Sequence, residues 1–123
     1  MNESKIITAN NEYKKWIADL KRLIKSTQIK ASIAVNEEML ELYWSIGHDI
    51  SEKQLDSKYG SKFFETLSAE IRKDFPDTQG FSERNLRYMK QFYIFYKDIL
   101  HQLGAEFESR IFTIPWRHHI EIF

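Results

Sequence analysis

Apolar residues recur at helical spacing along most of the chain. Between residues 12 and 54 they return every three or four positions without a proline, which predicts one very long helix or two helices with a bend near Ser26. A third helix is predicted after Gly60, and it should end at Asp74 because Pro76 follows closely. The pattern predicts an all-α domain of about five helices with no substantial sheet.

The fourth predicted helix begins at Ser82 and runs to about Ile99. Ser82 is a good N-cap, and Glu83 in the first turn suits the positive end of the helix dipole. A turn at residues 77–80 joins this helix to the third one, which together predict a helix-turn-helix with a somewhat long turn. The buried stripe of the fourth helix is predicted to consist of Leu86, Met89, Tyr93 and Tyr96.

Cationic and amide side chains lie on a neighbouring stripe of this fourth helix. We expect Arg84, Arg87 and Lys90 to contact phosphates, and Asn85 or Gln91 to lie near base edges. The alternative is an ordinary amphipathic helix whose polar face is solvated. Spacing alone does not separate the two.

Domain organisation follows from where the pattern starts and weakens. Residues 1–10 are expected to form a flexible polar lead-in, and residues 11–123 a single helical domain. Residues 54–59 are interpreted as a polar connector. Gly47 lies inside a predicted helix, where we expect it to permit close packing of a neighbouring helix rather than to end its own.

The last 24 residues differ from the rest of the chain in their residue pattern. Gly104 interrupts the preceding helix, and Pro115 suits the first turn of another short helix. The partly alternating stretch from Phe107 to Ile114 leaves a short wing-like hairpin as an alternative. Seven large apolar side chains gather here: Ile111, Phe112, Ile114, Trp116, Ile120, Ile122 and Phe123. Because such a group is costly to expose, we expect this tail to pack against residues 12–54 of a second copy in a homodimer.

Composition narrows the classes of protein. The chain has 42% apolar residues, no cysteine, and no apolar run long enough to span a membrane, so a soluble cytoplasmic protein without disulfides or zinc–thiolate sites is expected. The 18 cations balance the 18 anions, which argues against strong nonspecific nucleic-acid binding. Residues 58–98 nevertheless hold eight cations and six anions, so a modest positive bias lies around the fourth helix.

The sequence gives only weak signals for catalytic or metal-binding residues. Adjacent helical residues point about 100° apart, so His118 and His119 cannot chelate one ion together, and both are expected to be structural or solvent-facing. Glu37, Glu38 and Glu41 are expected on a solvated face, and Trp44 in the core rather than on a stacking platform. The sequence therefore predicts no catalytic residue, metal, cofactor or small-molecule substrate.

Four blocks occur in an order typical of a known family. They are Leu42 to Gly47; Tyr59-Gly60 with Leu67-Ser68; Gly80 to Leu86 with Met89 and Phe92-Tyr93; and Ile114 to His119. In these blocks the chain resembles the N-terminal domain of the YhcG-type bacterial proteins assigned to the PD-(D/E)XK nucleases. The resemblance covers about residues 12–123. It implies a helical DNA-binding or interaction module whose nuclease carboxylates lie in a later domain, so the chain is expected to be truncated at its C-terminal end and not to be an enzyme.

Two functions remain open at this point. The first is a non-catalytic DNA-binding module that uses the fourth helix. The alternative is a helical interaction or oligomerisation module that positions a nuclease domain and touches no nucleic acid.

Overall fold

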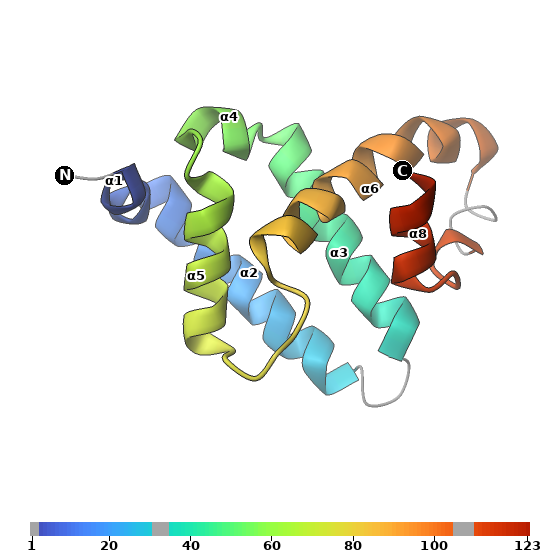
Figure 1. The fold of residues 1–123 in the computed structure, drawn as a ribbon, viewed down its shortest axis with the longest axis horizontal. Helices are drawn as coiled ribbons and strands as arrows, with labels where there is room; N and C mark the ends of the chain where they lie inside the picture. Colours follow the sequence, from blue (N-terminus) through green and yellow to red (C-terminus); the bar gives the residue numbers. More distant parts are fainter. Residues whose placement is uncertain (1–2, 31–34, 105–109) are drawn as a thin grey trace.

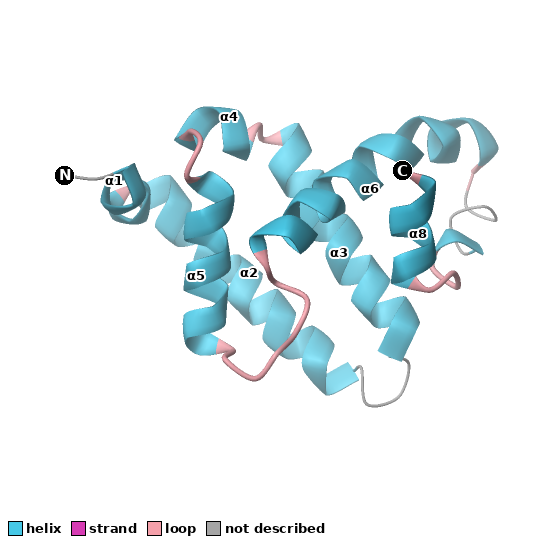
Figure 2. Cartoon of the chain, viewed as in Figure 1, coloured by secondary structure: helices cyan, strands magenta, loops and turns pink. Residues whose placement is uncertain are grey.

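The computed structural model describes residues 3–30, 35–104 and 110–123, which form seven bounded helices and no strand (Figures 1 and 2). This confirms the all-α prediction for the described residues, with more helices than the five expected. In chain order they are α1 (Glu3–Ala9), α2 (Asn11–Lys30), α3 (Val35–Glu52), α4 (Leu55–Tyr59), α5 (Phe63–Asp74), α6 (Glu83–Leu103) and α8 (Trp116–Ile122).

The long apolar stretch of residues 12–54 forms two helices, α2 and α3, as one of the two alternatives predicted. The expected bend near Ser26 is wrong, because α2 continues to Lys30 and Thr27 within it is buried. A weak apolar pattern does not end a helix when tertiary contacts still support it. The two helices pack against each other (Figure 1).

Two short helices occur where the sequence predicted none. The expected lead-in contains α1, whose Ile7 is 2% exposed and belongs to the core. The expected polar connector contains α4, whose Leu55 is buried. In each case one apolar residue reaches the core, and a single residue gives too little periodicity to predict a helix.

The central contact of the fold is between α3 and α6, which is the most extensive helix pair. Gly47 lies at this contact: a Cβ atom there would stand 2.0 Å from the backbone oxygen of Met89. The prediction that this glycine permits close helix packing is confirmed. The predicted stripe of α6 is buried as well, and it also includes Phe92.

Helix α5 and helix α6 are joined through residues 75–82. Helix α5 ends at Asp74 as predicted, whereas α6 extends to Leu103 rather than Ile99 and stops at Gly104, which has a φ of 81°. The connection is longer than the three to four residues of a DNA-binding helix-turn-helix. That motif therefore stays a prediction.

The tail folds back on its own chain. Ile111, Phe112 and Trp116 are buried, and α8 packs against α6 (Figure 1). Packing on a second copy was predicted because the apolar side chains of the tail are costly to expose. That reason is wrong for these three residues, which their own chain buries. Of the wing-like alternative, residues 107–109 lie outside the described residues, and residues 110–114 contain no strand.

Candidate nucleic-acid interface

The start of α6 is held by its own N-cap and by side chains from α5 and α3. Ser82 caps α6 as predicted, its hydroxyl accepting from the backbone N–H of Asn85 at 3.1 Å. From α5, the buried Ser68 hydroxyl donates to the backbone oxygen of Phe81 at 2.7 Å. From α3, the Tyr43 hydroxyl fills the space beside Gly80, where an added Cβ would lie 2.3 Å from it. The turn therefore fixes where the first residues of α6 point.

The three predicted cations lie on α6 in different surroundings. The Arg84 side chain is exposed and makes no ion pair or hydrogen bond with another described residue. Arg87 is exposed, lies 4.5 Å from the ring centre of Phe64 and donates to Glu83 at 2.9 Å. Lys90 is partly buried and pairs with Asp56 of α4.

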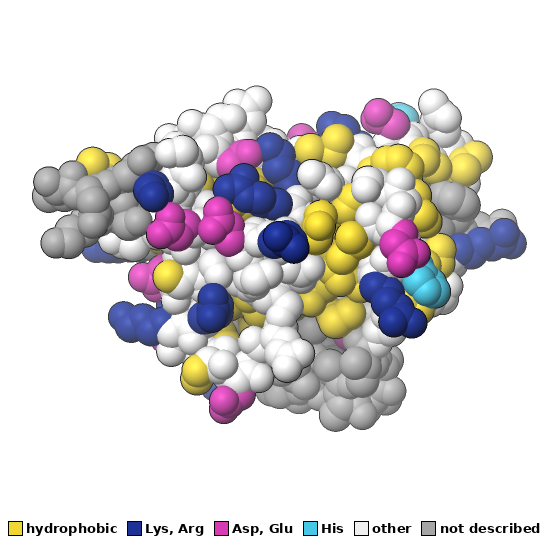
Figure 3. All heavy atoms as spheres, viewed as in Figure 1, with side chains coloured by type: hydrophobic (Ala, Val, Ile, Leu, Met, Phe, Trp, Pro, Cys, Tyr) yellow, Lys and Arg dark blue, Asp and Glu magenta, His cyan; other side chains and the backbone are white. Residues whose placement is uncertain are grey.

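Cations and anions are mixed on this side of the molecule. Figure 3 shows Lys and Arg side chains over α5 and the beginning of α6, with acidic side chains among them. Beside Arg87, a shallow hollow of about 250 Å³ is lined by Asp56, Phe64, Arg87, Lys90, Gln91 and Ile94. Gln91, expected near base edges, is an exposed residue that lines this hollow, and its role stays a prediction.

The side chain of Asn85, which we expected near base edges, makes its hydrogen bonds within the protein. Its Nδ2 donates to the backbone oxygen of Gly80 at 2.6 Å, and its Oδ1 accepts from Trp116 Nε1 at 2.8 Å. Its amide thus joins the turn, α6 and α8 inside the fold. Sequence reasoning missed this role because the Trp116 partner lies 31 positions further along the chain.

Three of the four blocks that carry the family resemblance, the first, third and fourth, meet in one region. The ring of Tyr43 lies 6.4 Å from that of Phe81 and 4.9 Å from that of Trp116. Trp44 packs against Phe92 at 5.4 Å, which confirms its predicted place at the core. These residues therefore pack together and fix the geometry around α6.

Helix α8 carries both histidines: His118 is exposed, whereas His119 is fully buried. The Nδ1 atom of His119 lies 3.0 Å from the Tyr96 hydroxyl, and its Nε2 atom lies 2.8 Å from the backbone oxygen of Ile111. Neutral imidazole satisfies both partners by accepting from the hydroxyl and donating to the carbonyl. Burial lowers the pKa of His119, which favours this neutral form. The expectation of structural and solvent-facing histidines is confirmed.

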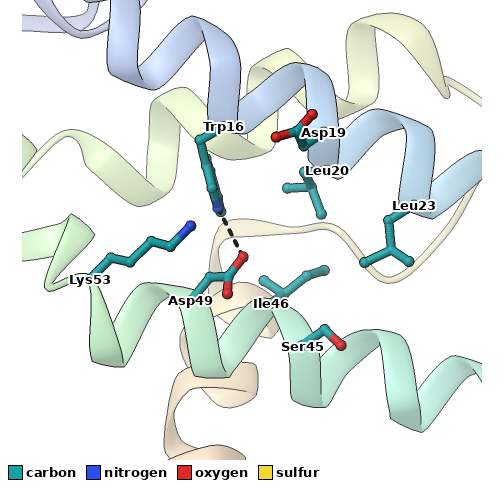
Figure 4. Close-up of a pocket in the computed structure, with 8 residues that line it drawn as sticks. All are labelled: Trp16, Asp19, Leu20, Leu23, Ser45, Ile46, Asp49 and Lys53. Carbon is teal, nitrogen blue, oxygen red and sulfur yellow. Dashed lines mark hydrogen bonds between the residues drawn. The ribbon is translucent and has the colours of Figure 1, made fainter.

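A second hollow lies between α2 and α3 (Figure 4), with a volume of about 130 Å³. Trp16 Nε1 donates to one carboxylate oxygen of Asp49 at 3.1 Å, and His48 Nδ1 lies 3.1 Å from the other. Lys53, which directly follows the end of α3, extends toward Trp16 in this view. With both carboxylate oxygens engaged, Asp49 acts here as a link between the two helices.

Two features of the described residues bear on other classes of function. Across residues 3–30, 35–104 and 110–123, no group of three or more His, Asp or Glu side chains is arranged to hold a metal ion. Within the same ranges, no helix has the length and apolar character needed to cross a membrane.

Comparison with known proteins gives one match. No curated protein and no solved structure matches the chain. The sequence profile of the DUF1016 N-terminal domain matches residues 19–123, a span that contains all four motif blocks, and no catalytic domain is matched. The match agrees with the resemblance to the N-terminal domain of the YhcG-type proteins. The chain therefore belongs to the DUF1016 N-terminal domain family, a domain of unknown function.

Proposed function

We propose that this domain is a non-catalytic module that binds nucleic acid through the outer face of α6. The observation that carries the proposal is the pair Arg84 and Arg87, exposed one turn apart on a helix whose start is fixed by the turn before it. In this proposal both guanidinium groups contact phosphates, Lys90 supports them, and Gln91 lies near base edges. Asn85 is left out of the interface because its amide serves Gly80 and Trp116.

The acidic neighbours do not prevent such binding. Arg87 pairs with Glu83 while both side chains are about half exposed, and exposed ion pairs contribute about 0–1 kcal/mol. Exchanging this carboxylate for a phosphate therefore costs little. Lys90 and Asp56 are less exposed, so their pair is harder to exchange and Lys90 is assigned the smaller share of binding.

Salt dependence tests the proposal directly. We expect Arg84→Ala and Arg87→Gln each to weaken binding and to lower the slope of log affinity against log salt by about 0.9 per lost phosphate contact. The control Lys15→Ala removes an exposed cation from α2 and should leave the slope unchanged. Fluorescence anisotropy with labelled duplex and single strands, titrated from low salt upward, measures both quantities.

A further variant separates base contacts from phosphate contacts. Gln91→Ala should keep the salt slope of the unmodified domain while it reduces discrimination between sequences. If no nucleic acid form binds at low salt, or if the arginine variants behave like Lys15→Ala, the proposal fails. The interaction-module alternative would then replace it.

A further inference from the structure

The shallow hollow beside Arg87 is formed by three helices. Its lining residues come from α4, α5 and α6 in turn: Asp56; Phe64; and Arg87, Lys90, Gln91 and Ile94. On α6, Arg87, Gln91 and Ile94 follow one another at spacings of four and three residues, so they share one face of the helix. Successive turns of this face therefore bring a guanidinium group, an amide and an apolar side chain to the same hollow.

Two contacts hold the guanidinium group of Arg87 in place. Its Cζ atom lies 4.5 Å from the ring centre of Phe64, and one of its nitrogen atoms donates to Glu83 at 2.9 Å. Phe64 is buried, whereas the Arg87 side chain is 49% exposed, so the ring covers one part of the guanidinium group and leaves the rest open. Nucleobases stack on guanidinium planes as they do on aromatic rings. Arg87 therefore offers a stacking surface whose orientation is fixed before a ligand binds.

The other lining residues provide what an unpaired base needs. Ile94 is 42% exposed, and the exposed Gln91 side chain makes no hydrogen bond with another described residue. An amide has donors and an acceptor for the edge of a base, and an apolar side chain packs against its plane. The hollow holds about 250 Å³, less than the roughly 300–1,000 Å³ of pockets that enclose a drug-sized ligand. Its size therefore suits a single base.

A recessed site of this kind favours single strands over duplex. A base inside a duplex is stacked on both faces and paired at its edge, so it can enter a hollow only after it leaves the helix. The charge of the chain points the same way. Duplex binding depends mainly on phosphate contacts, but the 18 cations of this chain are balanced by 18 anions. Single-strand binding adds base stacking to the phosphate contacts.

We propose that this hollow takes one unpaired base of a single-stranded nucleic acid. The base stacks on the guanidinium plane of Arg87, packs against Ile94 and forms hydrogen bonds with the Gln91 amide. Arg84, one turn earlier on α6, contacts a flanking phosphate. Stacking uses the face of the Arg87 plane, so N–H groups at its edge remain available for a phosphate. The assignment rests on the proposed function of α6 and narrows its ligand to single strands.

Binding of the full chain to defined oligonucleotides tests this assignment. Fluorescence anisotropy compares a labelled single strand of about 12 nucleotides, the duplex of the same sequence, and a single strand in which abasic sites replace the bases. We expect the intact single strand to bind more tightly than the duplex. The abasic strand should bind about tenfold more weakly than the intact one at the same salt slope, because it loses stacking and keeps every phosphate.

One substitution in the protein changes the hollow without changing charge. Ile94→Asn should weaken binding of the intact single strand by about threefold or more, while its salt slope and the affinity for the abasic strand stay as in the unmodified chain. Ile122→Asn is the matched control, because it makes the same change at a 54% exposed position on α8 and should leave binding unaltered. Circular dichroism checks that both variants fold. If Ile94→Asn unfolds the chain, the abasic strand decides.

The possible results separate this assignment from the proposed function. Tighter binding of the duplex, equal binding of the abasic strand, or a folded Ile94→Asn that behaves like Ile122→Asn would overturn the assignment and leave phosphate binding by α6 standing. If no form binds at low salt, both proposals fail. Mononucleotides should compete only weakly, because they lack the flanking phosphates. Competition by mononucleotides at micromolar concentration would overturn the assignment to a strand and indicate a free nucleotide as the ligand.

Discussion

At the scale of single residues, small groups determine how closely the helices approach. Gly47 allows α3 to meet the backbone of α6, and Gly80 leaves room for the Tyr43 hydroxyl beside the turn. Gly80 also has a φ of 100°, a conformation that other residues rarely adopt. The position of the α6 face that carries Arg84 and Arg87 therefore depends on the absence of a side chain at both glycines.

Gly47→Ala gives a test at this scale. Alanine favours a helix by about 1 kcal/mol over glycine, but here its Cβ would stand 2.0 Å from the Met89 oxygen. The Met89 backbone cannot rotate away from the added Cβ as a side chain could. We therefore expect a net loss of about 1–3 kcal/mol in the free energy of unfolding. Urea denaturation measures it. Ser51→Ala, also on α3, should change stability by less than about 0.5 kcal/mol, and an equally small effect of Gly47→Ala would contradict the close contact.

At the scale of elements, α8 is too short to be stable by itself and is held by specific contacts. Its Trp116 donates to Asn85, and its His119 joins Tyr96 of α6 to the backbone at Ile111. Protonated His119 could no longer accept from the Tyr96 hydroxyl, and its charge would be buried among aromatic rings. Docking of α8 therefore requires neutral imidazole.

This requirement predicts how stability depends on pH. Because burial lowers the pKa of His119 below its usual 6.5, the unfolded chain binds this proton before the folded chain does. The free energy of unfolding should therefore fall as pH decreases from about 6.5 toward 5. Urea denaturation across this range measures the slope.

The controls for this prediction lie in the same chain. His119→Gln should flatten the slope, whereas His118→Gln, which alters an exposed neighbour, should keep it. Hydrogen bonds from Lys58 and Lys21 lower the pKa values of Glu12 and Asp74, but those carboxylates titrate below about pH 4.5 and stay outside this range. A slope that survives His119→Gln would show that another group is responsible.

At the scale of the whole molecule, the core extends beyond the family match. The profile begins at residue 19, yet α1 packs against α2 and α5 and contributes Ile7. We expect Ile7→Ala to lower the free energy of unfolding by about 2–4 kcal/mol, as is usual for truncation of a buried side chain. The neighbouring Ile6→Ala removes the same atoms from a 58% exposed position and should cost less than about 0.5 kcal/mol. Equal effects of the two substitutions in urea denaturation would show that α1 is not part of the core.

Several features were determined by the sequence alone. The three-to-four-residue periodicity predicted the helical class and the buried stripe of α6, because which side of a helix is buried follows directly from residue spacing. Local chemistry predicted the Ser82 cap and the end of α5 before Pro76, since both depend on neighbours within a few residues. The order of the motif blocks identified the family.

Tertiary structure decided the features that depend on residues far apart in the chain. Asn85 looked like a base-contacting residue, but Trp116 and the turn use its amide inside the fold. The tail looked unpaired in the sequence, but Phe112 and Trp116 pack against rings of α3 and α6. Helix α1 could be recognised only from the burial of Ile7. Spacing tells which side chains share a face, whereas only packing tells what covers that face, because the covering residues carry no local signal.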